Sequence, residues 1–556
     1  MRIGAMERVM SSIVQTCRFV ILVGITACFA EGLLLNAAHA STDTTSPGFT
    51  PRGDQRLIVC HDPAQGWAAA NPALNEIAGE TLKSPEAWKQ AVQDIVRAHA
   101  DAGVDTIVHN LFIYFATNMA PDVSDITEPI YNLVPQLQPL ETMHEAGLDL
   151  VNIMLDQSHT EGMTFIAGFR MNDRHGAAAE ARMFVDNPQW HARGVARGLD
   201  YAHQEVRDRL VTAIGDVINH YDVDGIELDY MRWLFMFSLG EEAQHAPLLT
   251  AMHRRIRKLL DDVGRKRGRH LLFGVRVPDV LEEGALYGFD IATWIQEGNL
   301  DYIVPSHFGY MDFNAKIERY RLLTEGTNCR VYPSLNLWAG PCRLGIEEAK
   351  ESWKPKHYYA AAHNYYAYGA DGIATYNYLP ISNVSVSTML RRLNALSPLK
   401  DPAQLDARHR DYLFFSRLHG QVHPDSPVGV IRYDVIHLDR SRPDTAHPFG
   451  FRVAEDLARG QSTAALEFKA VSIEPEETLE LQLNGVAIPA DALARLYVWD
   501  GIDHKGRPKP YDLFRLSLTD QWLRHGDNVL EIRLAEPVGT KGVVRIEEVN
   551  VKVYPH

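Results

Sequence analysis

Short apolar runs alternate with longer amphipathic stretches between about residues 55 and 395. This alternation is typical of repeated strand–helix units around a parallel sheet. Eight runs have the length and composition of buried strands: 57–60, 105–114, 162–173, 223–230, 270–279, 300–308, 330–338 and 371–379. Eight such units over about 340 residues predict a (β/α)8 barrel. A doubly wound sheet would instead carry a glycine-rich phosphate loop after its first strand, and the sequence has none there.

The stretches between these runs have the spacing of helices that pack on one face. Residues 84–103 and 203–221 are the clearest examples. In the second stretch, one helical face carries Val206, Leu210, Ile214, Val217 and Ile218.

The pattern changes after about residue 440, where apolar and polar residues alternate one by one. Segments 464–471, 478–486, 528–537 and 543–554 read in this way, with turn residues such as Asn484-Gly485 between them. This alternation predicts an antiparallel β-sandwich. We therefore expect four parts, namely a signal peptide (1–40), a catalytic barrel (41–400), a connection (401–440) and a β-sandwich domain (441–556).

The first 40 residues have the order of a secretory signal peptide. Basic residues are followed by an apolar run, and Ala38-His39-Ala40 stand before Ser41 as a cleavage site. An alternative cleavage site exists, because Ile25-Thr26-Ala27-Cys28 resembles a bacterial lipobox. The sequence thus predicts a secreted or periplasmic protein, with a lipid anchor at Cys28 as the one expected link to a membrane.

The charge of the chain narrows the range of partners. Lys and Arg total 55 against 71 Asp and Glu, so the net charge is −16, which repels nucleic-acid phosphates. The 24 histidines are scattered without metal-ligand spacing, so we expect no metal and no cofactor. A chain cut after Ala40 keeps Cys60, Cys329 and Cys342, and a bridge between the last two stays open.

The fourth apolar run, 223–230, contains the candidate catalytic residues. Side chains alternate along a strand, so if Ile226 and Leu228 face the helices, Glu227 and Asp229 face the barrel axis. Inward carboxylates without partners are costly, and close pairs have the raised and split pKa values that acid–base chemistry needs. As an alternative, these carboxylates are held by inward arginines, for which Arg170 and Arg276 on the neighbouring strands are suited.

Residues 203–233, HQEVRDRLVTAIGDVINHYDVDGIELDYMRW, resemble a segment of the bacterial glycoside-hydrolase-like proteins described as family-10-like. The resemblance implies a secreted barrel protein that acts on polysaccharides. Asp229 falls on the aspartate of that family's motif, whereas Glu227 stands where histidine is usual and Trp233 where tyrosine and then proline are usual. The motif is also similar to the DGxDxDxE strand of chitinase-like barrels, but Met231 occupies the position of their acid glutamate, which disfavours a chitinase mechanism.

Glycoside hydrolysis usually needs a second carboxyl group, about 5–5.5 Å from the first for retention or about 6.5–9.5 Å for inversion. The run 330–338 ends without a carboxylate, so the partner of Asp229 must come from another strand. We prefer Asp279, which follows the adjacent fifth strand, although a helix cap is an alternative role for it. Glu227 is the second choice, and the other candidates are Asp173, Glu282 and Asp312.

Polar and aromatic residues at the ends of the strands suit a sugar, which offers hydroxyl edges and C–H faces. The candidate substrate-binding residues are Arg170, Asn172, Asp173, His175, Arg232, Trp233, His307, Trp338, Tyr376 and Asn377. The sequence therefore predicts a glycoside hydrolase with a polysaccharide or oligosaccharide substrate. The alternative is a non-catalytic carbohydrate-binding surface protein on a degenerate hydrolase barrel.

Overall fold

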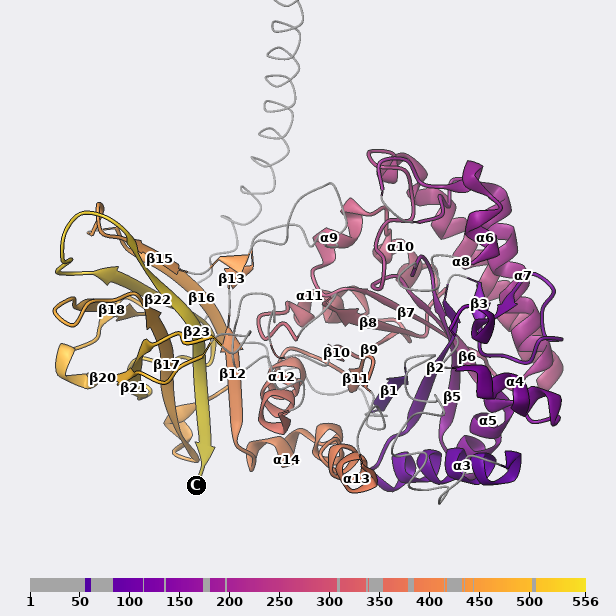
Figure 1. The fold of residues 1–556 in the computed structure, drawn as a ribbon, viewed down its shortest axis with the longest axis horizontal. Helices are drawn as coiled ribbons and strands as arrows, with labels where there is room; N and C mark the ends of the chain where they lie inside the picture. The colour runs from indigo at the N-terminus through magenta and orange to yellow at the C-terminus, as the bar shows by residue number, and fades with distance from the viewer. Residues whose placement is uncertain are drawn as a thin grey trace, which may run out of the picture. The chain divides into compact units, whose positions relative to one another are not determined.

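The computed structural model describes most of the chain beyond residue 55 (Figure 1). The described residues are 56–61, 84–113, 115–134, 137–173, 181–195, 198–307, 311–336, 339, 354–378, 385–414, 416–417, 433–434, 436–443, 445–502 and 507–556. The predicted signal peptide with Cys28, and also His175, Trp338 and Cys342, lie outside them. Within the described part, no helix is long and apolar enough to cross a membrane.

A ring of parallel strands forms the first part of the structure (Figure 1). Its strands are β1 (Leu57–His61), β2 (Thr106–Ile113), β5 (Thr164–Arg170), β6 (Gly225–Asp229), β7 (Leu272–Pro278), β8 (Tyr302–Ser306), β9 (Arg330–Val331), β10 (Ser334–Leu335) and β11 (Ile373–Thr375). The seventh strand is split, since β9 pairs with β8 while β10 pairs with β11, and β11 pairs in turn with β1. These pairings close the ring, so the predicted eight-stranded barrel is confirmed.

The helices lie outside the strands, as the amphipathic stretches predict (Figure 1). They are α3 (Pro85–Asp101), α4 (Gln138–Glu145), α5 (Leu150–Thr160), α6 (Arg182–Val185), α7 (Gln204–His220), α8 (Glu242–Arg267), α9 (Leu281–Leu286), α10 (Ile291–Gln296), α11 (Ile317–Leu323), α12 (Pro355–Ala367), α13 (Val386–Asn394) and α14 (Pro402–Asp406). Ser84 caps α3 by accepting a hydrogen bond from the Ala87 backbone N–H. The predicted apolar face of α7 is buried along its whole length. A small extension of the sheet is formed by β3 (Ala116–Thr117) and β4 (Glu128–Pro129).

Alternation along the strands separates two apolar clusters. The smaller one fills the barrel interior and consists of Ile58, Cys60, Val108, Ile166, Tyr302, Val304, Tyr332, Ala374 and Tyr376. Ile226 and Leu228 of β6 belong instead to the larger cluster between the strands and the helices. Glu227 and Asp229 therefore face the barrel axis, as the sequence predicts.

Two antiparallel sheets follow the barrel. One contains β12 (Arg410–Phe414), β15 (Ile436–Asp439), β17 (Ser462–Val471), β20 (Leu493–Val498), β21 (Tyr511–Leu518) and β23 (Val543–Pro555). The other contains β16 (His447–Val453), β18 (Leu479–Leu483), β19 (Val486–Ala487) and β22 (Gly526–Leu534), and a separate pair is formed by β13 (Ser416–Arg417) and β14 (Tyr433–Asp434). Buried side chains of both sheets belong to one apolar cluster. At the predicted turn, Asn484 and Gly485 both have positive φ and join β18 to β19.

The stretch 401–440, which the sequence analysis treats as a connection, contributes β12 and β15 to the first of these sheets. The sequence RDYLF of β12 lacks a strand-like pattern because it begins with two charged residues. Both are buried with partners, since Arg410 pairs with Glu455 and Asp411 with Lys356. Tertiary ion pairs thus let a charged segment form a buried strand at the edge of its sheet.

Gly225 begins β6 where the strand runs closest to β7. A methyl group at this position would lie 2.2 Å from the Leu272 carbonyl oxygen, a backbone atom that cannot move aside alone. We expect Gly225→Ala to lower the free energy of unfolding by about 1–3 kcal/mol. In the matched variant Gly215→Ala on α7, the nearest atom is a Leu259 methyl at 3.6 Å, so helix propensity raises that free energy by about 0.5–1 kcal/mol. Urea unfolding of both variants checks this, and equal stabilities would contradict it.

Candidate active site

The two oxygens of Asp229, at the end of β6, differ in their contacts. Oδ1 accepts hydrogen bonds from Arg276 Nη1 and from the Met231 backbone N–H, both at 2.9 Å. Oδ2 is buried without a hydrogen-bond partner in the described part of the chain, and Arg170 Nε lies 4.0 Å from it. The carboxylate is therefore fixed through one oxygen and unbonded at the other.

Arg276, inward on β7, is held from three directions. Its Nε donates to Ser306 Oγ at 3.0 Å, and its Nη2 donates to the His307 carbonyl at 3.3 Å. The Tyr376 ring covers the guanidinium, with its centroid 3.2 Å from Cζ. The arginine is only 1% exposed, so its pairing with Asp229 compensates both charges inside the barrel.

A second pair of charges lies beside the first. Arg170 donates to Asp173 Oδ2 at 2.9 Å and to Asn377 Oδ1 at 2.6 Å, and Arg232 Nε lies 3.5 Å from Asp173 Oδ2. Asn377 has a φ of 48°, a left-handed conformation that asparagine tolerates. The structure thus brings together five predicted sugar-binding residues, Arg170, Asp173, Arg232, Tyr376 and Asn377. Among the described residues, no group of three or more His, Cys, Asp or Glu side chains is placed to hold a metal ion.

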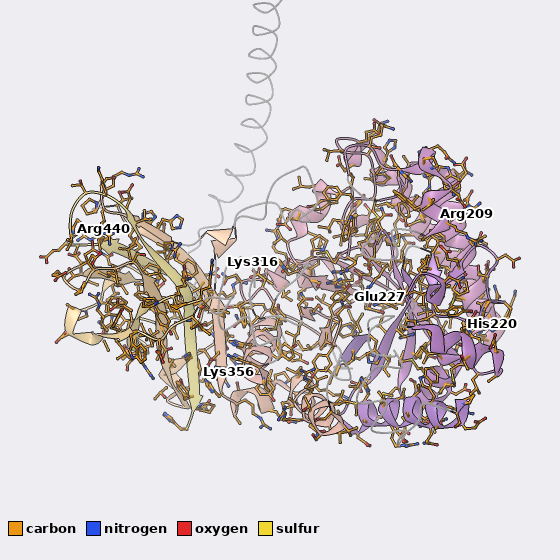
Figure 2. The ribbon with its side chains drawn as sticks, viewed as in Figure 1. Arg209, His220, Glu227, Lys316, Lys356 and Arg440 are labelled. Carbon is orange, nitrogen blue, oxygen red and sulfur yellow. The ribbon has the colours of Figure 1, made fainter. Side chains whose placement is uncertain are left out.

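Glu227, which is labelled in Figure 2, lies two residues deeper in the barrel than Asp229 and is 3% exposed. On the adjacent strand it is opposite Gly274, where a methyl group would lie 2.0 Å from the Tyr302 ring. The missing side chain at Gly274 therefore leaves room for Tyr302 beside Glu227. Burial first, and then the charge of Asp229, raise the pKa of Glu227 to about 7, against the opposing effects of Tyr302 and Arg276. Glu227 is thus a carboxyl group that holds its proton near neutral pH.

Asp279 follows β7 and is 3% exposed, with its backbone N–H bonded to the Ser306 carbonyl at 3.1 Å. The helix-cap alternative for Asp279 is wrong, because α9 has Val280 as its N-cap residue and no side-chain cap. Glu282 is exposed and pairs with Arg319 at 2.7 Å, which makes it a surface residue. Asp312 Oδ1 accepts from the Asn314 backbone N–H within its own turn. Asp279 as the partner of Asp229 therefore stays a prediction.

Three other predicted residues are built into the walls of the barrel. The Asn172 amide donates to the Leu199 and Phe235 carbonyls at 2.9 and 2.7 Å and accepts from the Leu199 N–H at 3.0 Å. Asn172 thus positions a loop rather than offering its amide to a sugar. Trp233 is 3% exposed and His307 is 2% exposed, so neither presents a ring face to solvent.

Sequence reasoning missed Tyr302 and Ser306. The Tyr302 ring lies beside Glu227, and Ser306 accepts a hydrogen bond from Arg276. Both lie on β8 at alternate positions with the inward Val304, so the alternation of side chains along the strand already predicted that they face the barrel interior. A tyrosine and a serine in an apolar run are, however, usual in barrel strands. Their role became visible only once the strands on either side were paired.

The raised pKa of Glu227 predicts a pH dependence of stability. Between the unfolded value near 4.5 and the folded value of about 7, the unfolded chain loses this proton while the folded chain keeps it. Stability therefore falls as pH rises through this window, by on the order of 3 kcal/mol from this group. We expect Glu227→Gln to be more stable relative to wild type at pH 8 than at pH 4 by about this amount, measured by urea unfolding. The exposed Glu205→Gln serves as the control, and a Glu227→Gln difference that is equal at both pH values would refute the assignment.

Comparison with known families places this site in context. Residues 113–246, which include β5, β6 and Asp229, match the model of the family described as Glycosyl hydrolase-like 10. The resemblance inferred from 203–233 is thereby confirmed. Glycosyl hydrolase YngK of Bacillus subtilis (strain 168) is 25% identical over 213 residues, which cover 31% of this chain and 41% of that relative. The match thus spans less than half of the relative's length.

Solved structures with similar folds include glycosidases. An alpha-L-fucosidase from Vibrio sp. strain EJY3 has 11% identity and a TM-score of 0.38, with coverage of 90% of this chain and 97% of the fucosidase. A family GH18 chitinase from Chromobacterium violaceum has 9% identity and a TM-score of 0.33, with coverage of 89% and 91%. These scores are low, so the barrel assignment rests on the strand pairing described above.

Proposed function

We propose that this protein is a glycoside hydrolase that acts on a polysaccharide outside the cytoplasm, with Asp229 as its nucleophile or charge stabiliser. The observation that carries the proposal is the asymmetry of Asp229, whose Oδ1 is bonded twice while Oδ2 has no hydrogen-bond partner among the described residues. A nucleophilic carboxylate needs this combination, because one oxygen fixes the geometry and the other meets the sugar. The family match over β5 and β6 supports the same class of chemistry.

In this mechanism, Asp229 Oδ2 faces the anomeric carbon and stabilises its developing positive charge, either by bonding to it or through space. Arg276 keeps Oδ1 in place through the reaction. Asp279, at the end of the adjacent strand, is the proposed acid that protonates the leaving oxygen and then the base that activates water. Glu227 lies two residues before Asp229 on β6 and is the second candidate for this acid, because its pKa is raised to about 7.

The groups beside Asp229 suit hydroxyl recognition. Arg232 has a partly exposed side chain, and the buried Asp173 holds it at 3.5 Å. Tyr376 adds a hydroxyl that is buried without a hydrogen-bond partner among the described residues. Donors and acceptors of this kind, fixed on strand ends, recognise sugar hydroxyl groups.

A second candidate function, non-catalytic carbohydrate binding, is favoured by the burial of Asp229. Its side chain is 2% exposed and already paired with Arg276. If that pair only stabilises the barrel, the strand-end residues would bind a glycan without cleaving it. An assay of the wild type separates the two functions, since the protein cleaves a polysaccharide in one and binds it without cleavage in the other.

We expect Asp229→Asn to lower kcat by about 10³-fold or more on any polysaccharide that the wild type hydrolyses, because the amide is a poor nucleophile. Asp279→Asn lowers kcat by about 10²-fold or more through loss of the acid/base. The control is Glu282→Gln, three residues from Asp279 but exposed and paired with Arg319, which leaves kcat unchanged. Release of reducing ends from neutral, acidic and amino-sugar polysaccharides measures these rates. Activity of Asp229→Asn within tenfold of wild type would overturn the proposal.

The N-terminal segment predicts export, and we propose a mature protein that is secreted or periplasmic. Cleavage after Ala40 gives a free chain that starts at Ser41, whereas lipobox processing gives a lipid-modified Cys28. We expect the mass of the exported protein to correspond to a start at Ser41. Recovery of the intact 556-residue chain from the cytoplasm would contradict export.

A further inference from the structure

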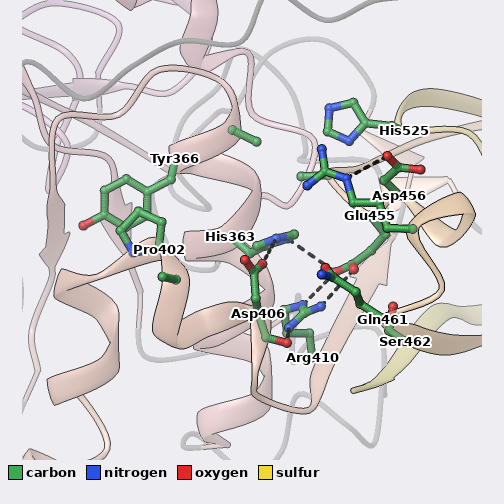
Figure 3. Close-up of a pocket in the computed structure, with 14 residues that line it drawn as sticks. His363, Tyr366, Pro402, Asp406, Arg410, Glu455, Asp456, Gln461, Ser462 and His525 are labelled. Atoms are coloured by element: carbon green, nitrogen blue, oxygen red, sulfur yellow. Dashed lines mark hydrogen bonds and ion pairs between the residues drawn. The ribbon is translucent and has the colours of Figure 1, made fainter. Parts of the chain in front are cut away.

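A cavity of about 370 Å³ is lined by residues of α12, α14, β12 and β17 and by residues 454–456, which follow β16. Asp229 is not among the lining residues, and Figure 3 shows those that are. Its volume is in the range of small-ligand sites. The walls come from parts of the chain far apart in sequence, from His363 on α12 to His525 before β22. The cavity is therefore a product of the tertiary fold.

The floor of the cavity is a fixed network of charges (Figure 3). Arg410 donates to both oxygens of Glu455, at 2.7 and 2.9 Å. His363 lies between two carboxylates, with Nε2 3.1 Å from Asp406 Oδ1 and Nδ1 3.3 Å from Glu455 Oε1. These groups satisfy one another, so the floor is rigid and its charge is largely compensated.

Some other polar side chains that line the cavity form no hydrogen bonds within the described part of the chain. Among the described residues, Gln461, Ser462 and His525 have no side-chain hydrogen bond or ion pair, although all three line the cavity. They offer an amide, a hydroxyl and an imidazole, which both donate and accept. Apolar parts of the lining come from Ala367, Pro402, Ala403 and Ala454.

The charged residues that line the cavity indicate which class of ligand it can bind. Three carboxylates, Asp406, Glu455 and Asp456, line the cavity with two arginines, Arg410 and Arg459, and two histidines. A phosphate would meet the carboxylates and a polyamine would meet the arginines, so neither is favoured. A neutral polyhydroxylated ligand fits, because its hydroxyls donate to carboxylates and accept from the amide and imidazole while its C–H face packs on alanine and proline.

We propose that this cavity is a second glycan-binding site, which holds a neutral sugar unit of the polysaccharide away from the barrel mouth. The choice of a sugar as occupant rests on the proposed hydrolase function. A second site of this kind would keep the chain bound between cleavage events, since two linked contacts raise the effective concentration of the substrate.

The test uses the full mature protein carrying Asp229→Asn, with glucose, galactose and N-acetylglucosamine as neutral probes and inorganic phosphate and spermidine as charged ones. Ala403→Phe places a ring in the cavity, and Ala407→Phe, just past α14 and outside the cavity, is the matched control. Ligand-observed NMR titration gives the Kd. We expect at least one neutral sugar to bind, with a Kd raised at least tenfold by Ala403→Phe and by Gln461→Ala but not by Ala407→Phe.

Three results would overturn this proposal. No neutral sugar binds, or sugar binds equally well to every cavity variant, or phosphate or spermidine binds more tightly than any neutral sugar. Failure of the hydrolase proposal gives a different result, because the wild type would then cleave no polysaccharide while sugar binding still depended on Ala403 and Gln461. The Ala403→Phe variant with Asp229 intact should hydrolyse short oligosaccharides at the wild-type kcat. Thermal unfolding of each variant shows whether it folds.

Discussion

The ion pair between Arg276 and Asp229 is the interaction on which the barrel mouth depends. Both side chains are almost fully buried, and an unpaired charge at either position would cost several kcal/mol. The neighbouring strands are therefore organised around the guanidinium, with Ser306 and the His307 carbonyl on one side and the Tyr376 ring over its face. Because Arg276 uses only Oδ1 of Asp229, the other oxygen is buried without a hydrogen bond among the described residues.

Glu227 is a further ionisable group buried beneath the Arg276–Asp229 pair. Glu227 lies below Asp229, and two adjacent carboxylates in a buried site do not both ionise readily. Its pKa is raised to about 7 as a consequence, so in mildly acidic solution the second negative charge is largely avoided. Gly274 makes this arrangement possible, since it leaves the space that the Tyr302 ring occupies.

Much of this arrangement was predictable from the chain. The period of two along 223–230 correctly places Glu227 and Asp229 inside the barrel, and the choice of Arg276 as a partner follows from its place on the adjacent strand. The roles of Asn172 and Tyr302 were not predictable, because each depends on which backbone or side chain another strand brings near it. For the same reason β12 was missed, since its charged residues resemble a loop until Glu455 and Lys356 are placed beside them.

The central claim is that Asp229 Oδ2 meets the anomeric carbon while Arg276 holds Oδ1. The most direct test is a crystal structure of the Asp279→Asn protein with an uncleaved oligosaccharide bound in the barrel. The account predicts an anomeric carbon about 3–3.5 Å from Asp229 Oδ2, with the Arg276–Oδ1 bond retained. A bound sugar chain with no anomeric carbon near Oδ2, or an Oδ2 that accepts a hydrogen bond from Arg170 instead of meeting the sugar, would contradict it.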